Sequence, residues 1–161
     1  MFSTTNAEIW IHNQYQERSV EIILKQGAAG LLLDPGLGKT SCSLSAFKIL
    51  KEMGFVKRML VIAPVRPMYM TWPAEINKWS NFEDLTYGIL HGKDKDWLVD
   101  NCKDVDVLFI NPEGLPWLNQ QLKQIPKKNW PFDMLVVDES TKFKNMSSVR
   151  FDEIKNIIPK M

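Results

Sequence analysis

The length and composition of the chain are those of one globular domain. It has 161 residues, of which 45% are hydrophobic, so a single core is expected and wholesale disorder is excluded. The formal net charge is +1, and this balance neither suggests nor excludes a nucleic-acid partner. The two cysteines, Cys42 and Cys102, form no C-x-x-C pair, which argues against a zinc site or a disulfide framework.

The sequence contains no recognisable membrane or secretory segment. The N-terminus lacks a basic stretch followed by an apolar run, and the uninterrupted apolar runs are too short to cross a bilayer. We therefore expect a soluble cytoplasmic protein with no membrane partner.

Short apolar runs alternate with longer amphipathic segments along the chain. The runs have the length of strands, and all but the third are apolar nearly throughout: Ala28–Leu33, Met59–Ala63, Thr86–Leu90, Val107–Ile110 and Met134–Val137. The helices expected from the apolar spacing and the Gly and Pro signals are Gln14–Gln26, Lys39–Met53, Pro67–Trp79, Glu113–Ile125 and Ser147–Ile158. This alternation predicts an α/β fold with a mainly parallel sheet flanked by helices.

The segment before the second helix has the features of a phosphate-binding loop. An apolar run is followed by Gly36, Leu37 and Gly38, whose backbone can turn so that several N–H groups converge on phosphate oxygens. In such a loop Lys39 reaches the β- and γ-phosphates of a nucleotide, and the Thr40 hydroxyl binds Mg²⁺.

This match is incomplete at one position. The pattern G-x-x-x-x-G-K-S/T has its first glycine where Leu33 stands, so the prediction rests on the glycines nearest the lysine. An ordinary glycine turn that caps a helix is the alternative.

A second candidate motif lies about a hundred residues further on, where the apolar run Met134–Val137 ends in Asp138 and Glu139. A buried strand that ends in two acids places both carboxylates at the carboxyl edge of a sheet, where such folds bind ligands. Asp138 is the predicted Mg²⁺ ligand, and Glu139 is predicted to orient and deprotonate the attacking water. A strand that simply ends in polar residues is the alternative.

The rest of the chain distinguishes among the families that share these two motifs. The segments that carry the distinction are Tyr15-Gln16, Asp34–Thr40, Ala63–Arg66, Trp72–Glu75, Lys78-Trp79, Asn111–Leu115 and Asp138–Asn145. In this order and spacing they resemble the superfamily-two helicases and translocases, specifically the Swi/Snf-like branch in its phage or bacterial form. The resemblance implies that the chain is the first, RecA-like lobe of such a motor, encoded by a phage or a bacterium. For a phage protein the compartment would be the host cytoplasm.

The resemblance also implies roles for residues outside the two motifs. Gln16 stands where the family carries its Q motif and would read the adenine edge of ATP. Arg66 and Asn111 stand in the regions of motifs Ia and Ib and would contact the backbone of DNA, which is expected to be duplex, although a structural role explains each of them equally well. The neighbouring Trp72 and Trp79 are expected to pack in the core.

Two positions depart from the family pattern. The loop usually reads D-E-M-G-L-G-K-T, and apolar Leu33 replaces its first acid. Motif II usually ends in a histidine that couples the ATP and nucleic-acid sites, and Thr141 stands in its place.

Compared with the family, residues 1–161 make up a lobe that is incomplete at its C-terminal end. The family continues with a motif III strand, inserted between the strands of motifs I and II, and with a second RecA-like lobe. That lobe supplies an arginine finger, which contributes roughly 10³–10⁵ in rate. Neither Arg66 nor Arg150 lies in a motif that would serve, so we expect this chain alone to bind ATP and hydrolyse it very slowly. A fragment and one piece of a split protein are both compatible with the sequence.

The leading functional interpretation is thus the ATP-binding lobe of an ATP-dependent DNA translocase or helicase, with ATP and Mg²⁺ as cofactors and DNA and a second lobe as partners. A non-catalytic nucleotide-binding or assembly module is the alternative. A small-molecule kinase is disfavoured because such enzymes need a lid with arginines, and the chain has only four arginines.

Overall fold

The computed structural model describes residues 7–31, 36–126, 129–138 and 148–158, and it confirms the α/β architecture. Within these residues four parallel strands form one sheet in the order β2-β3-β1-β4. The strands are β1 (Met59–Ile62), β2 (Tyr87–Ile89), β3 (Val107–Ile110) and β4 (Met134–Val137).

The register of the sheet aligns the carboxyl ends of three strands with one another. Ile62 of β1 is aligned with Ile110 of β3 and with Val137 of β4. The ladder continues one step further, since the N–H of Asp138 donates to the carbonyl of Ile62 at 2.8 Å. Asp138 therefore lies at the carboxyl edge, as predicted, with its backbone fixed by the sheet.

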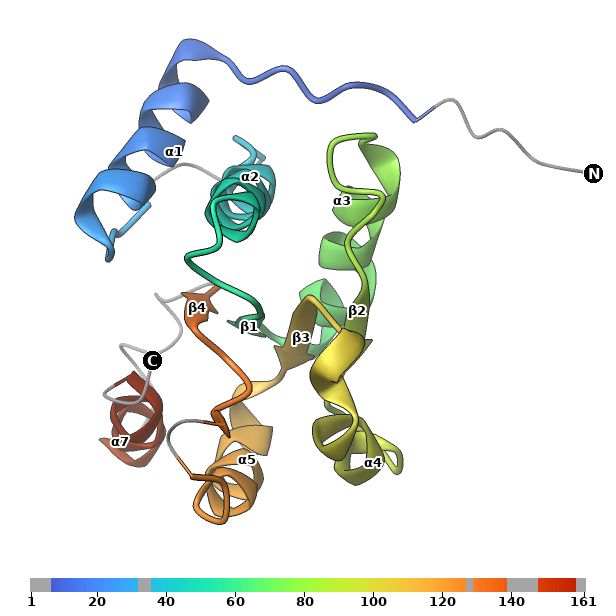
Figure 1. Ribbon diagram of the computed structural model, residues 1–161, viewed down its shortest axis with the longest axis vertical. Coiled ribbons are helices and arrows are strands. Elements are labelled where there is room, and N and C mark those ends of the chain that lie inside the picture. The colour runs from blue at the N-terminus through green and yellow to red at the C-terminus, as the bar shows by residue number, and fades with distance from the viewer. Residues whose placement is uncertain (1–6, 32–35, 127–128, 139–147, 159–161) are drawn as a thin grey trace, which may run out of the picture.

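Helices cover both faces of the sheet (Figure 1). On one face lie α1 (Gln14–Gln26), α2 (Lys39–Glu52) and α3 (Trp72–Lys78), with α1 packed against α2. On the other face lie α4 (Lys95–Asp100), α5 (Leu115–Leu122) and α7 (Ser148–Ile157).

Alternate side chains of each strand point to opposite faces and form two apolar cores. Met59 and Val61 belong to the core beneath α2 and α3, whereas Leu60 and Ile62 belong to the core beneath α5. All four are fully buried, which explains why the run is apolar without alternation.

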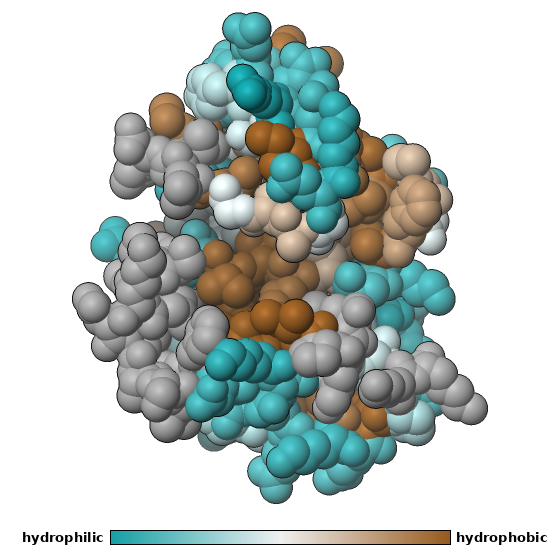
Figure 2. All heavy atoms as spheres, turned by 90° about the vertical axis from the view of Figure 1, so that its left-hand side faces the viewer, coloured by the Kyte–Doolittle hydropathy of each residue, from teal (hydrophilic) through white to brown (hydrophobic). Residues whose placement is uncertain are grey.

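The outer strands are less well covered. Tyr87 of β2 is exposed, which agrees with the polar character of the Thr86–Leu90 run, and every residue of β4 is partly exposed although the strand is apolar. Figure 2, which shows the molecule from the side on which β4 lies, has apolar surface in its middle between hydrophilic areas.

The prediction of a strand at Ala28–Leu33 is wrong for the four residues of this range that the structure describes. Ala28–Leu31 has no strand structure, and residues 32 and 33 lie outside the described residues. A strand needs a neighbour that supplies ladder hydrogen bonds, and none of the four described strands pairs with this segment. An apolar run indicates burial and cannot by itself indicate such a partner.

The predicted helices are largely confirmed. Gln14–Gln26 has both predicted ends, with Gly27 at φ 67° as its C-cap, and the second helix ends at Glu52, one residue early. The predicted Glu113–Ile125 is a 3₁₀ turn (Pro112–Gly114) followed by α5, and Pro116 lies in the first turn of α5. The helix α4 was not predicted because its six residues are too few to show an apolar period.

The helix predicted at Pro67–Trp79 begins two residues earlier and is wound unexpectedly. Val65 and Arg66 are already helical, so Pro67 lies within the first turn, and Pro67–Thr71 is wound as a π-helix before the α-helical part Trp72–Lys78. The N–H of Trp72 accordingly donates to the carbonyl of Pro67, five residues back. Single π turns of this kind are frequent at functional sites.

No helix in the described part of the chain is long and apolar enough to cross a membrane.

Both cysteine thiols are predicted to be unreactive in the folded chain. Burial raises the pKa of Cys42 to about 11, and burial likewise raises the pKa of Cys102. Since the thiolate is the reactive form, neither should be labelled by Ellman's reagent at pH 8 until denaturant unfolds the chain. Glu52→Cys, at the exposed end of α2, provides the rapidly labelled control. Native labelling of Cys42 at the rate of that control would contradict the burial described here.

Candidate functional site

The described part of the predicted phosphate loop has the backbone that the motif requires. Gly36 and Gly38 have φ values of 85° and 80°, in the left-handed region that favours glycine. Gly38 is the N-cap of α2, and no side chain caps its first turn. The first N–H groups of a helix without a capping side chain attract an anion, and the helix dipole adds to this attraction.

Gln16, in the first turn of α1, forms a hydrogen bond to this loop. Its side chain is 7% exposed, its Nε2 donates to the carbonyl of Leu37 at 3.1 Å, and its Oε1 accepts the N–H of Asn13 at 2.9 Å. A Cβ atom on Gly38 would lie 2.5 Å from Gln16 Nε2, so a side chain at position 38 would displace the Gln16 amide from its present position. The adenine contact expected for Gln16 stays a prediction.

A hydrogen bond to the partly buried carboxylate of Glu75 joins the first turn of α2 to α3. Ser41, which is 2% exposed, donates from Oγ to Glu75 Oε2 at 2.6 Å. The indole Nε1 of Trp79 donates to the same oxygen at 2.8 Å. The W-x-x-E pattern was singled out in the sequence, but the partner of its glutamate was not predictable, because Ser41 lies 34 residues away in the chain.

The same turn of α3 also holds the acid at the end of β4. The indole Nε1 of Trp72 donates to Asp138 Oδ2 at 3.0 Å. Trp72 and Glu75 are three residues apart and hence on one face of the helix. One face of α3 therefore bonds both to the helix that follows the glycine loop and to the predicted Mg²⁺ ligand, which brings the two motifs to the same edge of the sheet.

The residues at this edge fit a magnesium ion that is held jointly with phosphates. The described residues contain no group of three or more His, Cys, Asp and Glu side chains that could hold a metal ion alone. Mg²⁺ in nucleotide sites uses one or two carboxylates together with water and substrate phosphates, so Asp138 and the partly buried Thr40 are a sufficient protein contribution. Lys39 is the first residue of α2, as predicted, and is partly buried.

The two residues predicted to contact nucleic acid differ in their exposure to solvent. Arg66 is exposed at the start of the π turn, whereas Asn111 is 7% exposed and its Nδ2 donates to Glu113 Oε2 at 2.8 Å. Their contacts with nucleic acid stay predictions. Glu139 and Thr141 lie outside the described residues.

Sequence reasoning missed a pair of exposed aromatic residues near Arg66. The hydroxyl of Tyr69, on the π turn, lies 2.9 Å from Nδ1 of His91, which follows β2 at the carboxyl edge. The two residues are 22 positions apart and share no motif, so only the fold reveals that they meet.

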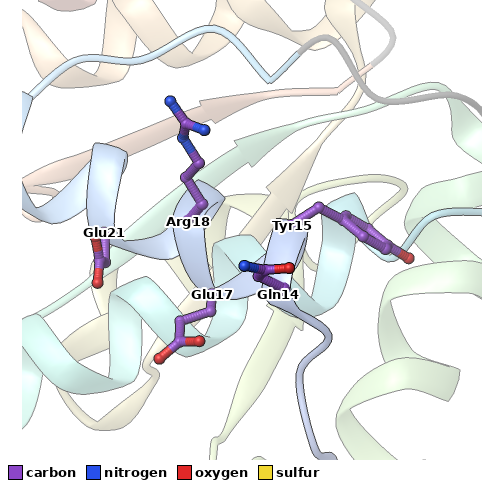
Figure 3. A pocket seen from close by; sticks show the side chains of 5 residues that line it. All are labelled: Gln14, Tyr15, Glu17, Arg18 and Glu21. Atoms are coloured by element: carbon purple, nitrogen blue, oxygen red, sulfur yellow. The ribbon is translucent and has the colours of Figure 1, made fainter.

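A surface hollow of about 500 Å³ lies beside α1 (Figure 3). Its lining residues are Gln14, Tyr15, Glu17, Arg18 and Glu21. All five come from one helix, and none belongs to the glycine loop or to β4, so the hollow is not assigned to phosphate binding. Tyr15 points away from Arg18 and Glu21 in this view, and the side chains do not converge on one point.

Comparisons with known proteins agree with this geometry. Residues 15–160 match the family described as the SNF2-related domain. Protein p41 of Acyrthosiphon pisum secondary endosymbiont phage 1 is 30% identical over 133 residues, which cover 81% of this chain and 28% of that protein.

Two solved structures have a similar fold. The Sulfolobus solfataricus SWI2/SNF2 ATPase core in complex with double-stranded DNA is 23% identical with a TM-score of 0.72, and the match covers 96% of this chain and 32% of that one. The ATPase core domain of the same organism is 23% identical with a TM-score of 0.69, covering 97% and 31%. The chain thus spans less than a third of the length of each relative, and its fold is that of a RecA-like lobe.

The contact between Gln16 and Gly38 predicts a measurable difference between two glycine substitutions. Gly38→Ala and Gly54→Ala both place a side chain at positive φ, which costs about 1–2 kcal/mol, but only the former meets another atom. Displacing Gln16 would break its bond to Leu37, so Gly38→Ala should destabilise the chain by about 1 kcal/mol more in urea unfolding.

A second substitution identifies the cause of that difference. Adding Gln16→Ala to Gly38→Ala removes the obstructing side chain, so the two changes together should cost less than the sum of their separate effects. Strict additivity would show that Gln16 and Gly38 do not interact.

Proposed function

Because the chain belongs to the SNF2-related domain family, the Swi/Snf-like branch of the superfamily-two helicases, we propose that residues 1–161 form the ATP-binding lobe of an ATP-dependent DNA translocase. The observation that supports this most strongly is the pair of hydrogen bonds from one face of α3. They join the helix behind the glycine loop to the acid at the end of β4. In such a lobe these two segments hold opposite sides of a magnesium-bound triphosphate.

Each residue of the proposed site has a role that follows from its chemistry. The N–H groups of Gly36–Thr40 and the start of α2 bind phosphate oxygens, and the Lys39 ammonium neutralises charge on the β- and γ-phosphates. Thr40 and Asp138 supply oxygen ligands for Mg²⁺, which when bound offsets the charge that develops on the phosphates. Glu139 positions the attacking water and accepts its proton. Gln16 binds the edge of the adenine.

The partly exposed edge of the sheet supports completion of the lobe by further polypeptide. Every residue of β4 is apolar and partly exposed, and apolar surface lies on this side of the molecule (Figure 2). The family resemblance implies a further strand beside the strand of motif II, and β4, which lies at the edge of the sheet among the described strands, could pair with one. We propose that a second lobe, in the same or another chain, supplies the arginine that accelerates hydrolysis.

Duplex DNA is the proposed partner of the exposed residues at the carboxyl edge. One of the similar structures is an ATPase core in complex with double-stranded DNA. Arg66 is exposed there, three residues before Tyr69, whose hydroxyl pairs with His91. A guanidinium and two hydrogen-bonding side chains suit phosphate oxygens, which carry no sequence information. The residues therefore fit a motor that moves along DNA of any sequence.

Nucleotide binding is predicted to depend on Lys39. Titration of the purified chain with a fluorescent ATP analogue in Mg²⁺ should give saturable binding, and Lys39→Ala should weaken it at least tenfold because it removes a charge-assisted contact to phosphate. Lys25→Ala, on the exposed end of α1, is the control and should bind as the unchanged chain does. Equal binding by the two variants would refute the proposed loop, and rapid DNA-stimulated hydrolysis by this chain alone would refute the need for a second lobe.

DNA binding is predicted to depend on Arg66 through an ionic contact. In assays with short duplexes, Arg66→Ala should weaken binding about equally for different sequences and lower the salt dependence by roughly one phosphate contact. Arg18→Ala changes an exposed arginine on α1 and should leave both quantities unchanged. An unaltered salt dependence in Arg66→Ala would remove Arg66 from the interface.

A further inference from the structure

The indole of Trp72 is held in place by burial, by a ring contact and by a hydrogen bond. The residue is 1% exposed, and its ring packs against Phe109 of β3 with the ring centroids 5.8 Å apart. Its Nε1 nonetheless finds a partner at the edge of the sheet, namely Asp138 Oδ2 at 3.0 Å. A buried donor on a rigid ring holds its acceptor with little loss of side-chain entropy.

The π turn before α3 determines where this indole points. Successive residues of a helix are rotated by roughly 100°, so one additional residue in the turn rotates every later side chain by that angle. With an ordinary α-helical turn, Trp72 would be rotated away from its present direction and from Asp138. The widened turn at Pro67–Thr71 thus accounts for the direction from which Trp72 reaches Asp138.

Asp138 has its backbone and its carboxylate held by different elements. Its N–H donates to the carbonyl of Ile62 in β1, and its Oδ2 accepts from α3. The bond to Oδ2 fixes rotation of the carboxylate about the Cβ–Cγ bond and hence the direction of the other oxygen. Residues that bond to metal-binding carboxylates in this way commonly change metal affinity by 10–100-fold when they are replaced.

We propose that Trp72 is a positioning residue for the magnesium-binding carboxylate of Asp138, and that the π turn aims it there. This inference rests on the proposed function, because it assumes that Asp138 binds Mg²⁺. Trp72 does not itself touch nucleotide. It holds the carboxylate in the orientation that the ion requires, so that little reorganisation accompanies binding.

The test compares two tryptophans with the same type of bond. Trp72→Phe removes the N–H donor and retains an aromatic ring, and Trp117→Phe does the same to the bond from Trp117 Nε1 to Asp96 Oδ1, on the opposite face of the sheet. The measurement is the Mg²⁺ concentration that half-saturates binding of a fluorescent ATP analogue to the full chain. Trp72→Phe should raise it by about tenfold or more, and Trp117→Phe should leave it unchanged.

A double-mutant cycle separates positioning from a general structural effect. In an Asp138→Asn chain, the additional Trp72→Phe change should alter the Mg²⁺ requirement by less than twofold, because the group to be positioned is absent. An equal effect of Trp72→Phe with and without Asp138 would overturn the proposal. So would an unchanged Mg²⁺ requirement in Trp72→Phe alone.

If Trp72→Phe does not fold, NMR measurements on chains that retain Trp72 test the same proposal. The indole N–H resonance of Trp72 in ¹⁵N NMR spectra should shift on Asp138→Asn and on addition of Mg²⁺ with ADP, and the Trp117 resonance should not. A Trp72 resonance that responds to neither change would overturn the inference. Failure of the unchanged chain to bind any Mg²⁺-nucleotide would instead contradict the proposed function itself.

Discussion

The first turn of α3 is the constraint on which the rest of the site depends. One face of it carries the buried Trp72 and the partly buried Glu75, and these two side chains bond to Asp138 after β4 and to Ser41 in α2, respectively. The glycine loop and the acidic strand end are a hundred residues apart in the chain and have no local reason to meet. The sheet register places Asp138 at the right edge, and α3 then fixes the direction of its carboxylate and the position of the helix behind the loop.

The sequence predicted the parts of this arrangement that depend on local patterns. The strands Val107–Ile110 and Met134–Val137 and the helix Gln14–Gln26 were predicted with their observed bounds, because continuous apolar runs and glycine-capped helices leave clear signals. The positive φ values at Gly36 and Gly38 followed from the motif. The contacts of Ser41, Trp72 and Gln16 could not be predicted, because each joins segments that only the fold brings together.

The errors have equally specific causes. Ala28–Leu31 is apolar but has no strand partner among the described strands, and hydrogen-bond partners cannot be read from composition. The π turn was missed because a proline such as Pro67 signals that a helix begins nearby and says nothing about how the following residues are wound. Trp72 was expected only to pack in the core. It does so, and the same buried position lets its N–H reach Asp138.

In the proposed site, the glycine loop and the end of β4 bind one and the same Mg²⁺-nucleotide. The most direct measurement is an NMR titration of the full chain with Mg²⁺ and ADP that follows the backbone amides of Gly38 and Asp138 together. Both amides should shift along one saturation curve with a single dissociation constant. A response at Gly38 alone, or two curves with different midpoints, would contradict this shared site.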